Sequence, residues 1–411
     1  MNANMKTTGV IIALMMVAAS AYWLGARQGS QPAPSVKSLA NAAPLPGTPE
    51  PSVVAADHPT VQPQPGVSLE IDNLRFAHFK VGNSNVKALL ADGPLLWVGT
   101  SGGVIRYDMG KDEHHLYDVR AGLLSNGIFH LSKYGERLLI GTYGGGLSLF
   151  DPAAETWANY NIQHGLADAF VYDVLQLDNG DMWIATWSGA NFVQGGRLDD
   201  RDAWSTYTVE NTGGGLPNDW VYALAKGKEG SIWMATEGGL AQFDNGEWRH
   251  WKHQDGLGAP YEVVREQIRF QRDPAKESSH HARQKAEMGL QGVDVAYNPN
   301  YIVSLYVDVH GVVWCGTWGG GLSRLEGNNW KTYTVADGLP SNHIFMLEAA
   351  KDGGLWIGTS DGLARFDGES FSLLTTHQGL FANNVFSLAR GESNELWVGS
   401  FGGVAKLEGI N

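Results

Sequence analysis

The chain has 411 residues, a formal net charge of −14, 18% charged residues, 53 glycines and 15 tryptophans. The negative charge argues against nucleic acid and anionic lipid surfaces as partners, because both would repel an acidic protein. The single cysteine, Cys315, excludes an internal disulfide, and we expect it to be a buried structural thiol.

The N-terminal 30 residues have the pattern of an export signal. Lys6 precedes an apolar run from Gly9 to Leu24, and Ala19-Ser20-Ala21 fits a small-residue cleavage site. An uncleaved segment with Tyr22 and Trp23 as interface anchors is the other interpretation. The sequence favours the uncleaved inner-membrane anchor slightly, and both interpretations place the body of the protein in the periplasm or outside the cell.

Residues 31–66 are rich in Pro, Ala, Ser and Val and have no periodic pattern. This composition predicts a semi-extended linker between the N-terminal segment and a folded body at 67–411.

A pentapeptide repeats seven times in that body, with a Trp or Leu at its second position and Thr or Ser at its end. The copies occupy 96–100, 138–142, 182–186, 232–236, 313–317, 355–359 and 396–400. Successive copies are 42, 44, 50, 81, 42 and 41 residues apart, and most of these steps suit a four-stranded blade. The repeat predicts an all-β fold, a seven-bladed β-propeller, with the pentapeptide tryptophans in the core.

The two ends of the repeat region complement one another. The last unit stops after its third expected strand, 403–407, whereas 76–81 matches a fourth strand with no blade before it. We therefore expect the N-terminal strand to complete the C-terminal blade and close the ring.

Turns between second and third strands and connectors between blades should emerge on one loop face, the usual binding surface of a propeller. Eight of fourteen equivalent positions there are aromatic or histidine. They are Tyr143, Trp187, Trp318, Phe401, Phe170, Trp220, Tyr301 and His343. Two interpretations stay open: these rings cap the blade edges, or they line a mouth that stacks on a sugar, a peptide or another flat apolar ligand.

An insertion of about forty residues, 258–298, separates blades four and five. Apolar spacing predicts helices at 261–270 and about 274–288. A lid or docking element, an inert decoration and a degenerate blade are the three possibilities for this insertion.

No hydrolase, zinc or phosphate-loop motif is present in the sequence, so we expect no catalytic residues, no metal and no cofactor. The pairs His114-His115 and His280-His281 are weak candidates for metal ligands. His130 and Asp173 occupy equivalent positions on neighbouring inner strands, which predicts a hydrogen-bonded pair near the channel.

The repeat resembles the two-component regulator propeller repeat. The residues that carry the resemblance are Leu355-Trp356-Ile357-Gly358-Thr359 with Gly362-Leu363, and Gly338-Leu339-Pro340-Ser341-Asn342. The resemblance covers roughly 76–411 and implies a ligand-sensing propeller of the kind found in periplasmic sensor regions of hybrid histidine kinases, often in glycan-responsive systems. A kinase core does not follow within the sequence, so only a binding role is expected to carry over.

The sequence therefore predicts a non-enzymatic, exported and membrane-tethered propeller. Its expected partners are a small molecule or glycan, or an envelope or signalling protein, bound through the loop face. A periplasmic lyase or hydrolase and a structural adaptor of an envelope complex are the alternatives.

Overall fold

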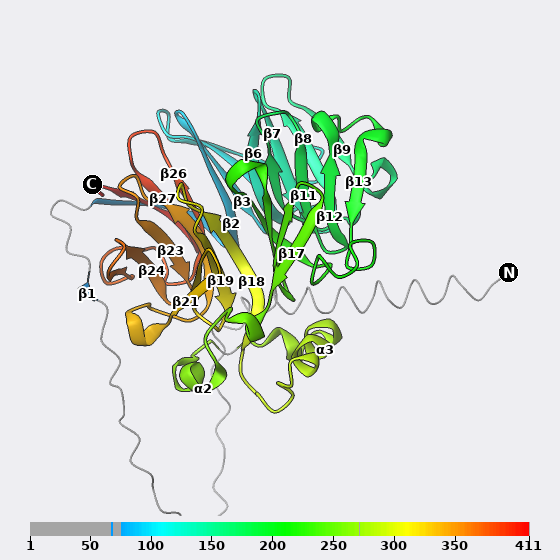
Figure 1. Ribbon diagram of the computed structural model, residues 1–411. Coiled ribbons are helices and arrows are strands. Elements are labelled where there is room, and N and C mark those ends of the chain that lie inside the picture. Colours follow the sequence, from blue (N-terminus) through cyan, green and yellow to red (C-terminus); the bar gives the residue numbers. More distant parts are fainter. Residues whose placement is uncertain (1–66, 69–74, 271, 411) are drawn as a thin grey trace, which may run out of the picture.

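A computed structural model describes residues 67–68, 75–270 and 272–410, and Figure 1 shows strands in radiating sheets with two small helices at one end. The expected N-terminal signal or anchor and the whole of the expected linker, 31–66, lie outside the described residues. Among the described residues, no helix has the length and apolarity needed to cross a bilayer.

The strands form six hydrogen-bonded sheets, four of which contain four antiparallel strands each. One comprises β6 (Ile128–Tyr134), β7 (Arg137–Thr142), β8 (Leu147–Asp151) and β9 (Thr156–Tyr160). The next comprises β10 (Val171–Gln176), β11 (Met182–Thr186), β12 (Gly189–Val193) and β13 (Trp204–Tyr207). The third comprises β14 (Val221–Lys226), β15 (Ile232–Thr236), β16 (Gly239–Asp244) and β17 (Glu247–Trp251). The fourth comprises β18 (Asn298–Val307), β19 (Val313–Trp318), β20 (Leu322–Glu326) and β21 (Asn329–Tyr333).

The other two sheets are larger. The five-stranded sheet contains β22 (Ile344–Ala349), β23 (Leu355–Thr359), β24 (Gly362–Phe366), β25 (Phe371–Leu374) and β1 (Val67–Ser68), which pairs parallel with β25. The six-stranded sheet runs in the order β26 (Val385–Arg390), β27 (Leu396–Glu408), β2 (Arg75–Asp92), β3 (Leu95–Thr100), β4 (Gly103–Asp108) and β5 (Glu113–Tyr117). Short 3-10 turns lie at 162–164, 194–196, 201–203, 228–230, 253–255, 265–267, 274–276 and 335–337.

The prediction of a seven-bladed propeller is wrong, because the described strands form six sheets. Two expected strands run together as the 18-residue β2, whose first part pairs with β27 and whose second part pairs with β3. The first and last repeats therefore share one sheet. The expected pairing of 76–81 with the C-terminal strand is present within it, with Phe76 opposite Leu407.

The insertion is also less helical than predicted. Its described residues form two short helices, α2 (Tyr261–Val264) and α3 (Ser279–Glu287), joined by 3-10 turns and extended segments. The first helix ends early because the chain after it extends to place Phe270 against Trp318 and His343. The second begins late because Asp273 caps a separate turn at 274–276 and pairs with Lys285 of α3.

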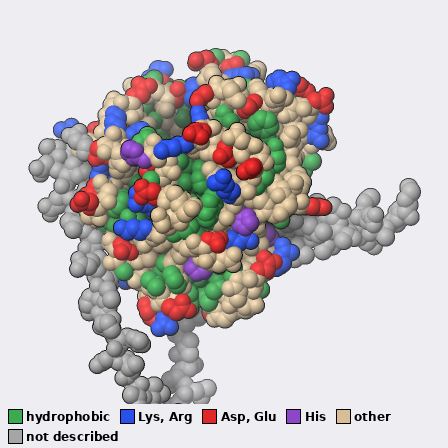
Figure 2. Space-filling view, viewed as in Figure 1, with side chains coloured by type: hydrophobic (Ala, Val, Ile, Leu, Met, Phe, Trp, Pro, Cys, Tyr) green, Lys and Arg blue, Asp and Glu red, His purple; other side chains and the backbone are tan. Residues whose placement is uncertain are grey.

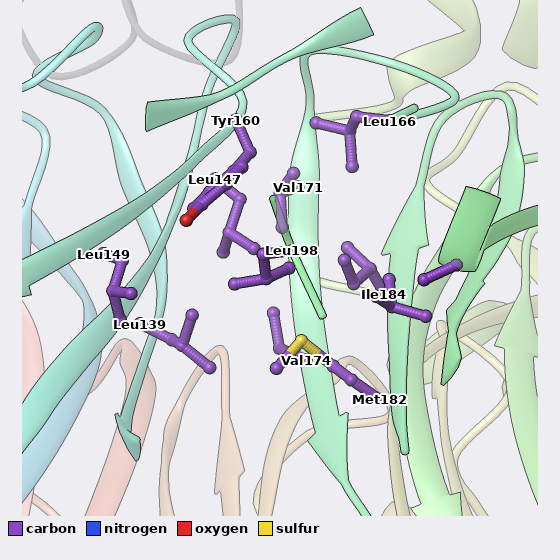
Figure 3. Close-up of a cluster of buried hydrophobic side chains, with 12 residues drawn as sticks. Leu139, Leu147, Leu149, Tyr160, Leu166, Val171, Val174, Met182, Ile184 and Leu198 are labelled. Atoms are coloured by element: carbon purple, nitrogen blue, oxygen red, sulfur yellow. The ribbon is translucent and has the colours of Figure 1, made fainter. Parts of the chain in front are cut away.

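The core lies between neighbouring sheets, where apolar side chains from both faces interdigitate. Figure 3 shows one such layer, with Leu139 and Leu149 of one sheet and Val174, Met182 and Ile184 of the next. The pentapeptide tryptophans are buried, which confirms their predicted scaffold role. The small residue near the end of the pentapeptide allows close approach, since a Cβ on Gly99 would lie 2.6 Å from Ile128 Cγ2.

Candidate functional site

The innermost strands are successive neighbours around a closed ring, and each has a register break at the same place. The residue skipped by the pairing is a β-bulge, which re-aims a side chain and strengthens the local twist. The skipped residues are Lys87, Phe129, Tyr172, Tyr222, Val303, Phe345 and Phe386. Five of these seven are aromatic, and we call those five the inner aromatic ring.

Members of the inner aromatic ring touch one another from strand to strand. The ring centroids of Phe129 and Tyr172 are 4.5 Å apart, and those of Tyr172 and Tyr222 are 4.8 Å apart. Phe345 and Phe386 stack at 5.5 Å, and Lys87 Nζ lies 4.9 Å from the Phe386 centroid. Sequence reasoning missed these residues, although each lies two positions after a connector residue that it had considered.

The turns that follow the pentapeptide are held by its final hydroxyl group. Thr186 Oγ1 donates to the carbonyl of Gly189 at 2.7 Å, and Thr236 Oγ1 donates to that of Gly239 at 2.7 Å. Thr317 makes the same contact with Gly321. The residue directly after each threonine is therefore presented from a rigid turn at the loop face.

Seven of the eight predicted contact residues lie in one run of rings, which we call the aromatic belt. The belt consists of Tyr143, Phe170, Trp187, Trp220, Tyr301, Trp318 and His343. Trp220 and Tyr301 are linked through His281 of α3, at 5.2 and 5.9 Å. Phe401 lies elsewhere, opposite Asn85 in the pairing of β2 with β27.

Part of the belt is a column of nearly parallel rings. Trp187 stacks on Phe170 at 4.3 Å with an interplanar angle of 14°, and on Trp220 at 4.4 Å with an angle of 4°. His280 covers the other side of Trp220 at 3.7 Å. Both faces of Trp187 and Trp220 are thus occupied by the protein's own rings, so a ligand would meet these indoles at their edges.

The insertion covers the other part of the belt. Trp318 and His343 are 2% and 1% exposed, and Phe270 of the insertion packs on both. His343 Nε2 lies 2.7 Å from the carbonyl oxygen of Ala296. Burial lowers the pKa of His343 to about 4, so its imidazole is neutral at pH 7 and donates Nε2–H to that carbonyl.

A buried carboxylate fastens α3 to the belt. Glu237 is fully buried in the turn after β15, and its two oxygens lie 2.9 Å from His280 Nε2 and 2.5 Å from His281 Nδ1. Burial alone would raise the pKa of Glu237, but the two histidines outweigh it and lower the pKa below its usual value. We call these three residues the clamp. The His280-His281 pair considered as metal ligands is engaged here, and no metal-binding cluster of three or more ligands occurs in the described part of the chain.

The uncovered part of the belt retains two buried hydrogen-bond donors without a partner in the described residues, Tyr143 Oη and Trp187 Nε1. Their rings are 5.9 Å apart in an edge-on arrangement, and both side chains are partly exposed. Burial raises the pKa of Tyr143 to about 12, so its hydroxyl stays protonated at pH 7. This corner of the site offers donors, which suit a ligand that carries acceptor oxygens.

Comparison with known proteins supports the repeat family. The two-component regulator propeller family model matches residues 215–238 and 338–361, so the chain contains repeats of that family. No curated protein matches the sequence.

Solved structures share the propeller fold at low sequence identity. The extracellular domain of a putative hybrid two-component system from B. thetaiotaomicron is 16% identical, with a TM-score of 0.61 over 82% of this chain and 42% of that one. The extracellular domain of a putative one-component system from the same organism is 18% identical, with a TM-score of 0.58 over 80% of this chain and 40% of that one. This chain therefore spans about two fifths of their length.

An enzyme with the same fold is also similar. A catalytically inactive variant of virginiamycin B lyase from Staphylococcus aureus, solved with quinupristin, is 9% identical, with a TM-score of 0.57 over 82% of this chain and 99% of that one. At these identities the comparisons establish the fold and leave the activity to the residues of the site.

Proposed function

We propose that this propeller, which carries two-component regulator propeller repeats, is a ligand-sensing or partner-binding module that acts through the uncovered part of its aromatic belt. The ligand is a small molecule or glycan, or a segment of an envelope or signalling protein. The sensor domains of similar fold support this class of function.

The observation that carries the proposal is the pair of unpartnered donors at Tyr143 and Trp187. A buried donor without an acceptor costs about 1–3 kcal/mol, and a ligand oxygen that reaches either donor would recover that energy. The stacked column holds both rings in place, so little ordering is needed on binding.

The experiment is a thermal-shift screen of the full chain against oligosaccharides and short peptides, followed by calorimetry with the probe that gives a shift. Trp187→Phe and Tyr143→Phe each keep an aromatic ring and remove one donor. Trp248→Phe, in the outer strand β17, is the matched control.

We expect the probe's affinity to fall roughly tenfold in each donor variant and to stay unchanged in Trp248→Phe, because one hydrogen bond is lost only in the first two. Unchanged affinity in both donor variants would place the ligand elsewhere.

We also propose that the protein is exported and held in the inner membrane by its first 30 residues. Lys6, the apolar run to Leu24 and the interface residues Tyr22 and Trp23 support this location. Alkaline extraction of cell membranes tests it: a retained full-length chain supports the anchor, and release of a shortened chain indicates cleavage.

A further inference from the structure

A second constellation lies on the inner strands β6 and β10, apart from the unpartnered donors of the belt. His130 Nδ1 is 2.9 Å from Asp173 Oδ1, and His130 Nε2 is 2.8 Å from Ser132 Oγ. The predicted pairing of His130 with Asp173 is therefore confirmed. The serine that completes the series was not anticipated, because only the strand conformation places it on the same side as His130.

The carboxylate is fixed in position by two backbone groups. The amide of Val174 donates to Asp173 Oδ1 at 2.9 Å, and that of Leu224 donates to Oδ2 at 2.8 Å. An ionised carboxylate accepts hydrogen bonds only, so the proton of a neutral His130 lies on Nδ1 and its Nε2 accepts from the Ser132 hydroxyl. This is the tautomer in which a histidine removes a proton from a serine.

A further amide donor stands beside the serine. Gln176 Nε2 is 3.4 Å from Ser132 Oγ and is held at 2.6 Å from the carbonyl oxygen of Lys133. The side chains of His130 and Asp173 are 13% and 25% exposed, so solvent reaches the group.

We propose that Ser132 is an activated nucleophile that accepts acyl groups from small esters, with His130 as general base, Asp173 as its positioning residue and Gln176 as a donor to the developing oxyanion. Ser132 Oγ attacks the ester carbonyl while its proton moves to His130 Nε2. The carbon–oxygen bond to the alcohol then breaks, and the departing alcohol takes that proton. Water hydrolyses the acyl-serine by the same route and releases the acid.

The competing explanation is a purely structural tie between neighbouring inner strands. Ser387 provides an internal example, because its hydroxyl donates to the Val86 carbonyl at 3.0 Å with no histidine involved. Ser387 is itself buried, so a structural tie predicts simply that Ser132 takes no label.

The test is labelling of the full chain with a biotinylated fluorophosphonate, followed by peptide mass spectrometry, together with the burst of p-nitrophenol from p-nitrophenyl acetate. We expect the label on Ser132, its loss in Ser132→Ala and its retention in Ser387→Ala. We expect Asp173→Asn to slow labelling at least 100-fold, because the amide favours the wrong histidine tautomer.

Thermal unfolding of each variant shows whether it is folded. Folded wild-type protein that takes no label on Ser132, or takes it equally on Ser387, would overturn the proposal. The outcome is independent of the ligand screen, which concerns Tyr143 and Trp187.

Discussion

The two parts of the aromatic belt are built from equivalent repeat positions but have different surroundings. Trp187 and Trp318 each follow the pentapeptide threonine, yet Trp187 is partly exposed whereas Trp318 is buried under the insertion. The covered part is packed like a protein interior, whereas the uncovered part is partly exposed to solvent. Each part keeps donors without a partner in the described residues: Trp318 Nε1 in the first, and Tyr143 Oη and Trp187 Nε1 in the second. Equivalent residues in a repeat protein are therefore buried in the scaffold or left partly exposed according to what packs above them.

Truncating the two tryptophans should separate these roles most strongly. Trp318→Ala should lower the free energy of unfolding by about 3–5 kcal/mol, because it leaves a cavity among Phe270, Tyr301 and Phe345. Trp187→Ala should cost about 1–2 kcal/mol, since part of its surface already faces solvent. Urea unfolding of both variants measures the difference, and equal losses would remove the distinction between the two parts.

Acid should weaken the covered part. The folded pKa of His343, about 4, lies below the unfolded value of 6.5, so its contribution to stability is complete above pH 6.5 and is lost as the pH falls towards 4. The expected loss is roughly 3 kcal/mol. His343→Gln keeps a donor for the Ala296 carbonyl and does not titrate.

Unfolding free energies at several pH values test this expectation. The variant should show a flatter profile between pH 6.5 and 4 than the wild-type chain. If the unfolding free energies of the variant and the wild type depend on pH with the same slope, groups other than His343 cause the acid sensitivity.

Weakening the clamp should expose rings of the aromatic belt that the insertion now covers. Glu237→Gln cannot accept from both His280 and His281 as the carboxylate does, so the attachment of α3 should weaken by about 1–3 kcal/mol. Limited proteolysis should then cut the insertion between 265 and 290 faster than in the wild type. Glu277→Gln, an exposed substitution in the same insertion, is the control and should leave the cutting rate unchanged.

The smallest expected effect concerns the donor alone. Trp187→Phe preserves stacking between Phe170 and Trp220 and removes the unpartnered Nε1–H. The free energy of unfolding should therefore change by less than about 0.5 kcal/mol, or increase slightly. Urea unfolding without any ligand measures it. A loss above 2 kcal/mol would show that this N–H already has a partner in the free protein.

The surface in Figure 2 mixes acidic and basic side chains. The candidate site is built instead from the aromatic rings of the belt. Their positions in the repeat were predictable, because turns and connectors can be counted from each pentapeptide. The stacking of Trp187 between two other rings was not, because it depends on the spacing of neighbouring sheets. The inner aromatic ring was missed because a bulge changes the side-chain alternation on which strand patterns rest.

The amino-acid sequence by itself determined the strands, the buried tryptophans and the close-packed glycines, since each depends on local periodicity. The incomplete repeats at the two ends also predicted that the N-terminal strand pairs with the C-terminal one. Tertiary structure decided that the first and last repeats merge into one sheet, that the insertion is mostly non-helical and that Glu237 fastens it over Trp318 and His343. These outcomes depend on contacts between segments far apart in the chain, and a local pattern contains no information about such contacts.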